Sequence, residues 1–149
     1  MKTANKIFNY NEVYLNKSLD QWAQETHEIM SKKYNWGKTL LKGMFGYDNM
    51  ISSIGYVFKF CPDKLNINCI AEFIHEGWSI NYIYWRDNKP WLKNKFYKKP
   101  YNSLGDDRRN NLSKKKFSNI PNEEKQKNII MAEYIFGQIP KYKKIISVI

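Results

Sequence analysis

The amino-acid sequence predicts a mainly α protein, a compact helical single domain with a long basic loop. Its 149 residues fit one domain with a modest core, and a hydrophobic content of 42% is typical of a globular chain rather than a disordered one. Apolar residues recur at helical spacing near residues 18–34, 63–85 and 122–137. Proline, glycine and lysine gather between the last two segments, which indicates an irregular connection.

The first helix is predicted over residues 18–34. Ser18 and Gln21 have the spacing of a capping box, in which two side chains satisfy orphan backbone N–H groups at the start of a helix. Gly37 is a typical residue at a helix stop. The apolar residues that share one face of this helix are Leu19, Trp22, Ala23, Ile29 and Met30.

Residues 39–60 allow two interpretations. The apolar residues from Leu40 to Phe45 favour a short helix closed by Gly46, followed by a second helix that Asp48 caps. The run 56–60 would also suit a strand, which leaves room for a short strand pair. We favour the helix, and Pro62 ends the element in either case.

The clearest helical pattern covers residues 63–85, with Asp63 as its expected N-cap. His75 and Glu76 lie at the edges of its apolar stripe. Since they are neighbours in sequence, they point about 100° apart on a helix and do not pair with each other. The stripe consists of Ile70, Phe73, Ile74, Trp78, Tyr82 and Trp85.

Residues 86–121 are expected to form a long basic loop, because two prolines and Gly105 interrupt any regular pattern. A connection of this length without structure of its own is usually functional or mobile. The last helix is expected to start near Pro121 and to end before Pro140.

Charge is concentrated in the second part of the chain. Residues 86–149 carry 16 of the 25 Lys and Arg side chains and only 6 of the 14 acidic ones. Such a field attracts nucleic acid, nucleotides or other phosphate-bearing ligands. The richness in Lys, Asn, Ile and Tyr is also typical of an AT-rich genome, so a plain solvated lysine-rich surface is the alternative.

Several functional classes find no support in the sequence. The two cysteines, Cys61 and Cys69, form no metal-ligand pattern and are expected to be free thiols in a reducing compartment. The HExxH pattern fails because Ser79 stands where its second histidine would be. No phosphate-binding glycine loop, nucleophile elbow, signal peptide or membrane-spanning run is recognisable. A cytoplasmic protein without a cofactor is expected.

The most informative stretch, Ile70-Ala-Glu-Phe-Ile-His-Glu-Gly-Trp-Ser79, combines a His-Glu pair with a tryptophan on one helix. Aromatic faces with a few polar groups are typical of small-ligand sites. Core packing is the alternative for the aromatic stripe, and a structural ion pair is the alternative for Glu76. The cations that could hold phosphates are Arg86, Lys98, Arg108, Arg109 and Lys125, and the alternative for Arg108 and Arg109 is a solvated face.

A resemblance follows from three motifs in order. His75-Glu-Gly-Trp-Ser79, Tyr101-Asn-Ser-Leu104 and the charged helix start at residues 117–125 together resemble the ryanodine-receptor (RyR) repeat domain, most of all its short stand-alone versions in bacteriophages and bacteria. The resemblance covers about residues 65–136. It leaves residues 1–62 as an N-terminal helical extension.

The chain departs from the RyR pattern in two respects. Asn128 stands where the family's Glu-Lys-x-x-Asp helix start has its aspartate, and the Gly-Trp-x-Tyr-Gly and His-Pro elements of the receptor repeats are absent. The resemblance implies a small, mostly helical module without catalytic activity. Some members of the family resemble binders of adenine nucleotides or related signalling molecules.

These observations favour non-catalytic binding of a nucleotide-like small molecule, in a phage protein that sequesters a host nucleotide immune signal in the host cytoplasm. A basic nucleic-acid- or protein-binding accessory protein is the second hypothesis, and a nucleotide-acting enzyme is the third. No membrane partner is expected, and a homo-oligomer is compatible with the sequence. The predicted ligand-binding residues are His75, Glu76, Trp78, Tyr82, Trp85, Arg86, Lys98, Tyr101 and Lys125.

Overall fold

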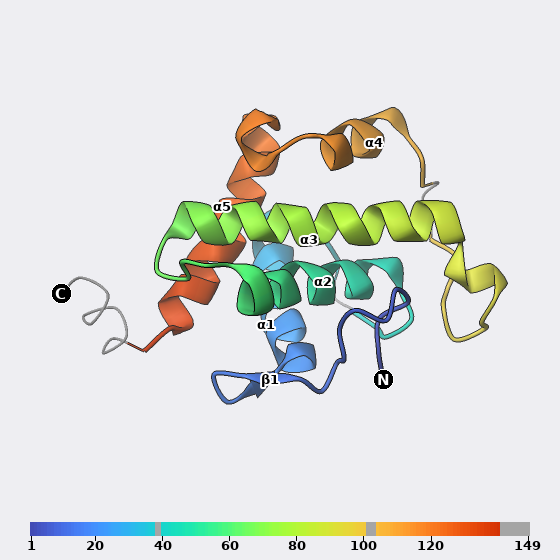
Figure 1. The fold of residues 1–149 in the computed structure, drawn as a ribbon, viewed down its shortest axis with the longest axis horizontal. Coiled ribbons are helices and arrows are strands. Elements are labelled where there is room, and N and C mark those ends of the chain that lie inside the picture. The colour runs from blue at the N-terminus through green and yellow to red at the C-terminus, as the bar shows by residue number, and fades with distance from the viewer. Residues whose placement is uncertain (38–39, 101–103, 141–149) are drawn as a thin grey trace.

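The computed structural model describes residues 1–37, 40–100 and 104–140 (Figure 1). Across these residues the chain forms five α-helices, two short 3-10 helices and one two-stranded hairpin, which confirms the predicted mainly α, compact single domain. In chain order the elements are β1 (Val13–Tyr14), β2 (Lys17–Ser18), α1 (Leu19–Tyr34), α2 (Phe45–Phe60), α3 (Ile67–Asn88), η1 (Pro90–Leu92), α4 (Asp107–Lys114), η2 (Phe117–Asn119) and α5 (Asn122–Gln138).

The antiparallel helices α2 and α3 run side by side at the centre of the fold (Figure 1). Their backbones approach closely where Gly77 of α3 crosses Ser52 and Ser53 of α2. A Cβ on Gly77 would lie 2.8 Å from the Cα of Ser53, and the Ser52 hydroxyl donates to the Gly77 carbonyl at 2.7 Å. The glycine between Glu76 and Trp78 therefore has a packing role.

Residues 56–60, for which the sequence allowed a helix or a strand, form the end of helix α2, as we expected. The expected short helix over residues 40–45 was wrong, and Gly46 lies inside α2 instead of closing a helix. Gly43 breaks the regular backbone there with a φ of 91°. Its carbonyl accepts a hydrogen bond from the backbone N–H of Lys98 at 2.8 Å, so this segment belongs to a turn.

Asp48 does not cap α2, as the sequence suggested, but lies fully buried in its first turn. Its carboxylate accepts hydrogen bonds from the Ala4 backbone N–H at 2.8 Å, the Trp85 indole at 3.1 Å and the Tyr10 hydroxyl at 3.2 Å. Burial raises the pKa of Asp48 to about 6, and the three hydrogen bonds limit the rise. This one carboxyl group ties the N-terminal segment to α2 and α3.

The predicted capping of two helices is only partly correct. In α1, Ser18 accepts a hydrogen bond from the Gln21 backbone N–H at 3.1 Å. The Gln21 side chain instead donates to Glu25 at 3.3 Å, so the second half of the capping box is not formed. In α3, Asn66 is the N-cap, because Asp63 accepts its hydrogen bond within the preceding turn.

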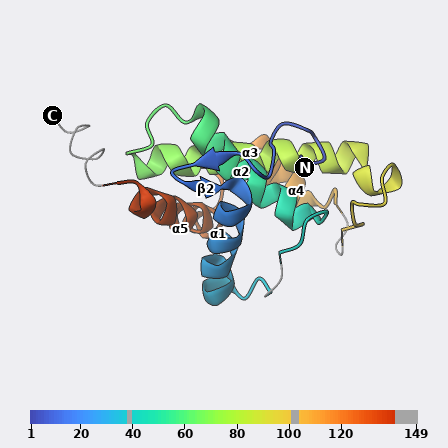
Figure 2. The same ribbon diagram turned by 90° about the horizontal axis from the view of Figure 1, so that it is seen from below.

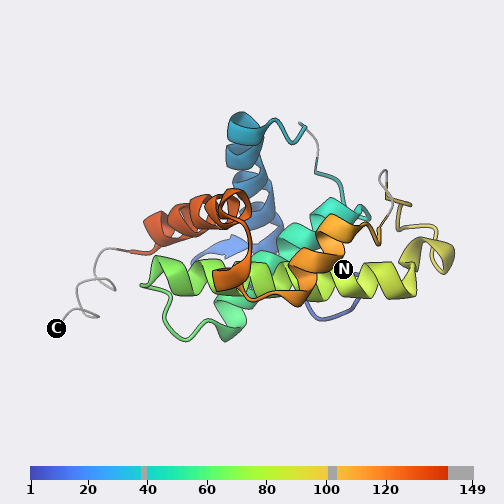
Figure 3. The ribbon, with the colours of Figure 1, turned by 90° about the horizontal axis from the view of Figure 1, so that it is seen from above.

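The segment expected to be a long loop contains η1, α4 and η2, and α3 continues to Asn88. Helix α4 lies along α3 on the side away from α2 (Figures 1 and 3). Asp106 caps it, accepting a hydrogen bond from the Arg109 backbone N–H at 2.8 Å. Only Leu112 of α4 is buried, so this helix has no apolar stripe that would reveal it in the sequence.

Helices α1 and α5 pack together and complete the core (Figure 2). The rings of Trp22 and Tyr134 meet edge to face at 6.1 Å, and the Tyr134 hydroxyl donates to Glu25 at 2.7 Å. Helix α5 also packs against α3, and it starts directly after Pro121 as the sequence suggested. The N-terminal halves of α2 and α5, the middle of α3, and α4 thus surround one region.

Candidate functional site

A stacked row of side chains follows α3 beneath α4. The rings of His75 and Trp78 are 6.1 Å apart at an angle of 14°, and those of Trp78 and Tyr82 are 5.2 Å apart at 9°. The Arg86 guanidinium continues the row, 5.7 Å from the Tyr82 ring, and it donates to the Asn110 side chain at 3.0 Å. The row places four of the predicted site residues on one face of the helix.

This row holds α4 in place at both ends. The His75 Nε2 lies 2.7 Å from the Lys115 carbonyl, so Nε2 carries the proton and donates it. The Tyr82 hydroxyl donates to Asn110 at 2.7 Å and accepts from the Gly105 backbone N–H at 2.9 Å. Helix α4 is short and polar and has no large apolar face, so these hydrogen bonds hold it beside α3.

Two adjoining cavities lie beside the row. The cavity lined by α4 has a volume of about 360 Å³ and is named the outer cavity, and the cavity that reaches His27 of α1 has a volume of about 250 Å³ and is named the inner cavity. They share the lining residues Trp36, Gly46, Asn49, Trp78 and Met131. The outer cavity is also lined by Phe45, His75, Arg108, Arg109, Leu112, Ile120, Glu124, Lys127 and Asn128, and the inner one by His27, Leu40, Met50 and Ser53.

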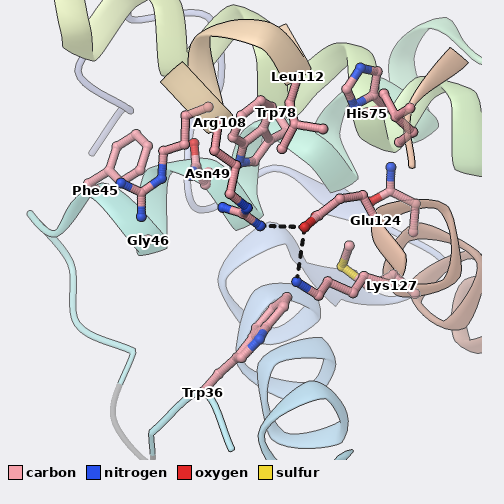
Figure 4. A pocket seen from close by; sticks show the side chains of 14 residues that line it. Trp36, Phe45, Gly46, Asn49, His75, Trp78, Arg108, Leu112, Glu124 and Lys127 are labelled. Atoms are coloured by element: carbon pink, nitrogen blue, oxygen red, sulfur yellow. Dashed lines mark hydrogen bonds and ion pairs between the residues drawn. The ribbon is translucent and has the colours of Figure 1, made fainter. Parts of the chain in front are cut away.

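The wall of the outer cavity is charged (Figure 4). Glu124 of α5 pairs with Arg108 of α4 and, at 3.3 Å, with Lys127 of α5. Arg109 pairs with Asp106 at 3.0 Å. The lining side chains thus include three cations and one carboxylate, which leaves a positive field for an anionic group.

Two tryptophans line both cavities. Trp36 follows α1 and is 41% exposed. Trp78 is half-buried and projects from the middle of α3 toward the same space (Figure 4). Their indole rings give the cavities aromatic surface of the kind on which planar heterocycles stack.

Among the predicted ligand-binding residues, His75 and Trp78 line the outer cavity. Tyr82 and Trp85 are fully buried. Tyr82 supports α4 through its hydroxyl, and Trp85 donates to the buried Asp48. The aromatic stripe of α3 therefore divides into residues that face the cavity and residues that build the core.

The other predicted residues lie elsewhere. Arg86 pairs with the aspartate that follows it, and Glu76 is exposed and lines a separate groove between α3 and the connection from α4 to η2. Lys98, in the connection after η1, and Lys125, near the start of α5, line neither cavity. Tyr101 lies outside the described residues.

Several lining residues were not among the predicted site residues. Trp36 directly follows a helix, and Asn49 is one of the few polar residues on the apolar helix α2. Glu124 and Asn128 are four residues apart on α5 and share a face.

Within residues 1–37, 40–100 and 104–140, no three His, Cys, Asp or Glu side chains gather as metal ligands would. No helix in the same ranges has the length and hydropathy to cross a bilayer. Compared with known proteins, the chain matches no family model, no curated protein and no solved structure. The similarity of residues 65–136 to the RyR repeat stays a prediction.

Proposed function

We propose that this protein is a non-catalytic module that binds a nucleotide-like small molecule in the two adjoining cavities. One observation carries the proposal: an apolar inner cavity and a cationic outer cavity share two tryptophans, Trp36 and Trp78. Sites of a few hundred Å³ with mostly apolar walls and few polar groups are typical of small-molecule binding.

The inner cavity suits a planar base. Leu40, Met50 and Met131 give it apolar walls, and Trp36 and Trp78 add aromatic faces. Stacking of a base on an aromatic side chain contributes about 1–3 kcal/mol. A nucleobase placed there gains this contribution whatever its identity.

The outer cavity suits the phosphate. Arg108 and Arg109 come from adjacent positions of α4, and Lys127 reaches the same space from α5. A phosphate group can replace the Glu124 carboxylate as the partner of Arg108 and Lys127, because both anions accept charge-assisted hydrogen bonds. The ligand would then span the two cavities, with its base in the apolar inner cavity and its phosphate in the cationic outer cavity.

The proposed resemblance to the RyR repeat favours the same class of ligand. In the phage setting that the composition favours, binding without chemistry would sequester a host nucleotide signal. This part of the proposal rests on analogy of family and setting, and the cavities themselves support only the ligand class.

The test is a thermal-shift panel of AMP, ATP, cyclic AMP and ADP-ribose. A ligand that binds only the folded state raises the melting temperature by mass action, so at least one of these is expected to do so. No shift with any of them would contradict the proposal. A DNA mobility shift at about 150 mM salt in the same preparation would support the basic nucleic-acid-binding alternative instead.

Trp78→Phe tests the stacking surface. It keeps most of the apolar volume and reduces the aromatic face, so calorimetric affinity for the best ligand of the panel is expected to fall by about 1 kcal/mol. Trp91→Phe is the matched control, because Trp91 stacks on Trp85 at 5.9 Å and lines neither cavity. Equal affinities for the two variants would contradict the placement of the base.

A further inference from the structure

A polar strip crosses the apolar inner cavity. Asn49 and Ser53 of α2 both line it, and they are one helical turn apart on the same face. Apart from His27, the other lining residues are apolar or, like Gly46, lack a side chain. Two polar side chains in such a place require an explanation.

Ser53 is the more informative of the two. It is only 4% exposed, none of the side-chain hydrogen bonds among the described residues involves its hydroxyl, and the residue lines the cavity. The adjacent Ser52 is fully buried as well, but its hydroxyl donates to the Gly77 carbonyl at 2.7 Å. Because Ser53 lines the cavity, its hydroxyl can pair with a molecule that enters there, and hydroxyls in such places are nearly always paired.

Asn49 is oriented by a second asparagine. The Nδ2 of Asn81, which is fully buried, donates to the Oδ1 of Asn49. This bond occupies the acceptor of Asn49, while its own Nδ2 has no partner among the described residues and its side chain faces the cavity (Figure 4). Asn49 therefore offers N–H donors to a ligand, and Ser53 can donate or accept.

We propose that Asn49 and Ser53 recognise the hydrogen-bonding edge of a heterocyclic base held beside Trp78. This inference rests on the proposed function and deepens it, because it names the chemistry that the inner cavity selects. The base must present an acceptor, a ring nitrogen or a carbonyl oxygen, to the Asn49 N–H group. A carbocyclic ring of the same size would leave both side chains unpaired, and sites built for hydrogen bonds reject such analogues strongly.

The experiment is isothermal titration calorimetry with two probes, AMP and the 5′-monophosphate of indole riboside, which has no acceptor on its ring system. The wild-type protein is expected to bind AMP about ten-fold more tightly than the indole compound. In Ser53→Ala this preference is expected to fall about five-fold, the loss of one hydrogen bond. Asn49→Leu is also expected to reduce the preference for AMP over the indole compound.

Ser52→Ala is the matched control, because the two serines are adjacent and both are buried. It breaks the hydrogen bond to Gly77 and should lower the melting temperature while the preference for AMP stays intact. Ser53→Ala removes an unpaired hydroxyl, so its melting temperature should not fall. The two variants therefore separate a role in stability from a role in recognition.

Two results would overturn the inference. They differ in whether the proposed function also fails. If wild-type protein binds AMP and Ser53→Ala keeps the full preference over the indole compound, the polar strip does not read the base, and the proposed function stands. If wild-type protein binds neither probe, this inference fails and the proposed function loses its nucleotide monophosphate as well.

Discussion

Glu124 is the residue that balances charge in the outer cavity. Its carboxylate holds both Arg108 and Lys127, and its side chain is 20% exposed. If the proposed function holds, a phosphate has to compete with this internal anion for the same two cations. Binding of the ligand therefore requires that the ion pair of the free protein is broken, and this cost lowers the affinity.

Glu124→Gln should consequently tighten binding. Removing the competing charge is expected to raise the affinity for a phosphate-bearing nucleotide about three-fold. Glu76→Gln makes the same change of charge at an exposed position outside the cavity and should have no effect. Competition titrations with the two variants measure this, and weaker binding by Glu124→Gln would show that the carboxylate contacts the ligand instead of opposing it.

Asp48 should give the protein a distinctive pH dependence. Its pKa is about 6 in the folded state and about 3.8 when unfolded, so between these values the folded state binds more protons. The contribution of Asp48 to the free energy of unfolding therefore falls as pH rises from about 4 to about 6, by about 3 kcal/mol in total. Above about pH 6 the full destabilisation caused by the buried, charged Asp48 is present.

Asp48→Asn removes this titration. Urea unfolding between pH 4 and pH 7 is expected to show that the stability of the variant, relative to wild type, increases with pH across that window. Subtracting the wild-type curve cancels the carboxyl groups that the two proteins share. Parallel pH profiles would mean that Asp48 is not buried in its charged form.

At the scale of elements, the helices with apolar stripes were predictable and α4 was not. Periodicity located α1, α3 and α5 within a few residues, because each buries a face in the core. Helix α4 buries only Leu112 and is held by hydrogen bonds from His75 and Tyr82, which no local pattern records. The outer cavity depends on α4, so the sequence could name Arg108 and Arg109 as candidate phosphate-binding cations but could not place them beside Glu124 and Lys127.

Contacts distant in sequence also explain why only one of the three predicted aromatic residues of α3 lines the cavity. Trp78, Tyr82 and Trp85 repeat at one helical period, and their spacing gives all three the same status. They differ in the contacts they make: Tyr82 meets Asn110 of α4 and Trp85 meets Asp48, while Trp78, stacked between His75 and Tyr82, also lines the outer cavity. Those partners are more than twenty residues away in sequence.

The crossing of α2 and α3 provides a test at this scale. Gly77→Ala places a methyl group against the Ser52 carbonyl oxygen and the Cα of Ser53, and neither backbone can move freely. We expect a loss of about 1–3 kcal/mol in the free energy of unfolding. Denaturant melts measure it.

Gly137→Ala in α5 is the control for the effect of alanine on a helix. No atom lies within 4 Å of its added Cβ, so it should stabilise the protein by about 0.5 kcal/mol through helix propensity. A neutral Gly77→Ala would contradict the close approach of the two helices.

At the scale of the whole molecule, two sources of attraction for an anionic ligand compete. One is the general field of a chain with a net charge of +11, which includes the exposed lysines 114–116. The other is the cavity, where Arg108, Arg109 and Lys127 converge beside two tryptophans. The attraction of a diffuse field depends on the number of charges and is screened by salt. The affinity of a cavity depends on where each charge lies.

The most direct measurement compares two variants by isothermal titration calorimetry with AMP. Arg108→Gln removes one positive charge from the cavity, and the triple variant Lys114→Gln, Lys115→Gln, Lys116→Gln removes three from the surface. If the cavity binds the nucleotide, Arg108→Gln lowers the affinity about ten-fold or more, and the triple variant changes it by less than about two-fold. A larger loss in the triple variant than in Arg108→Gln would contradict the cavity as the binding site.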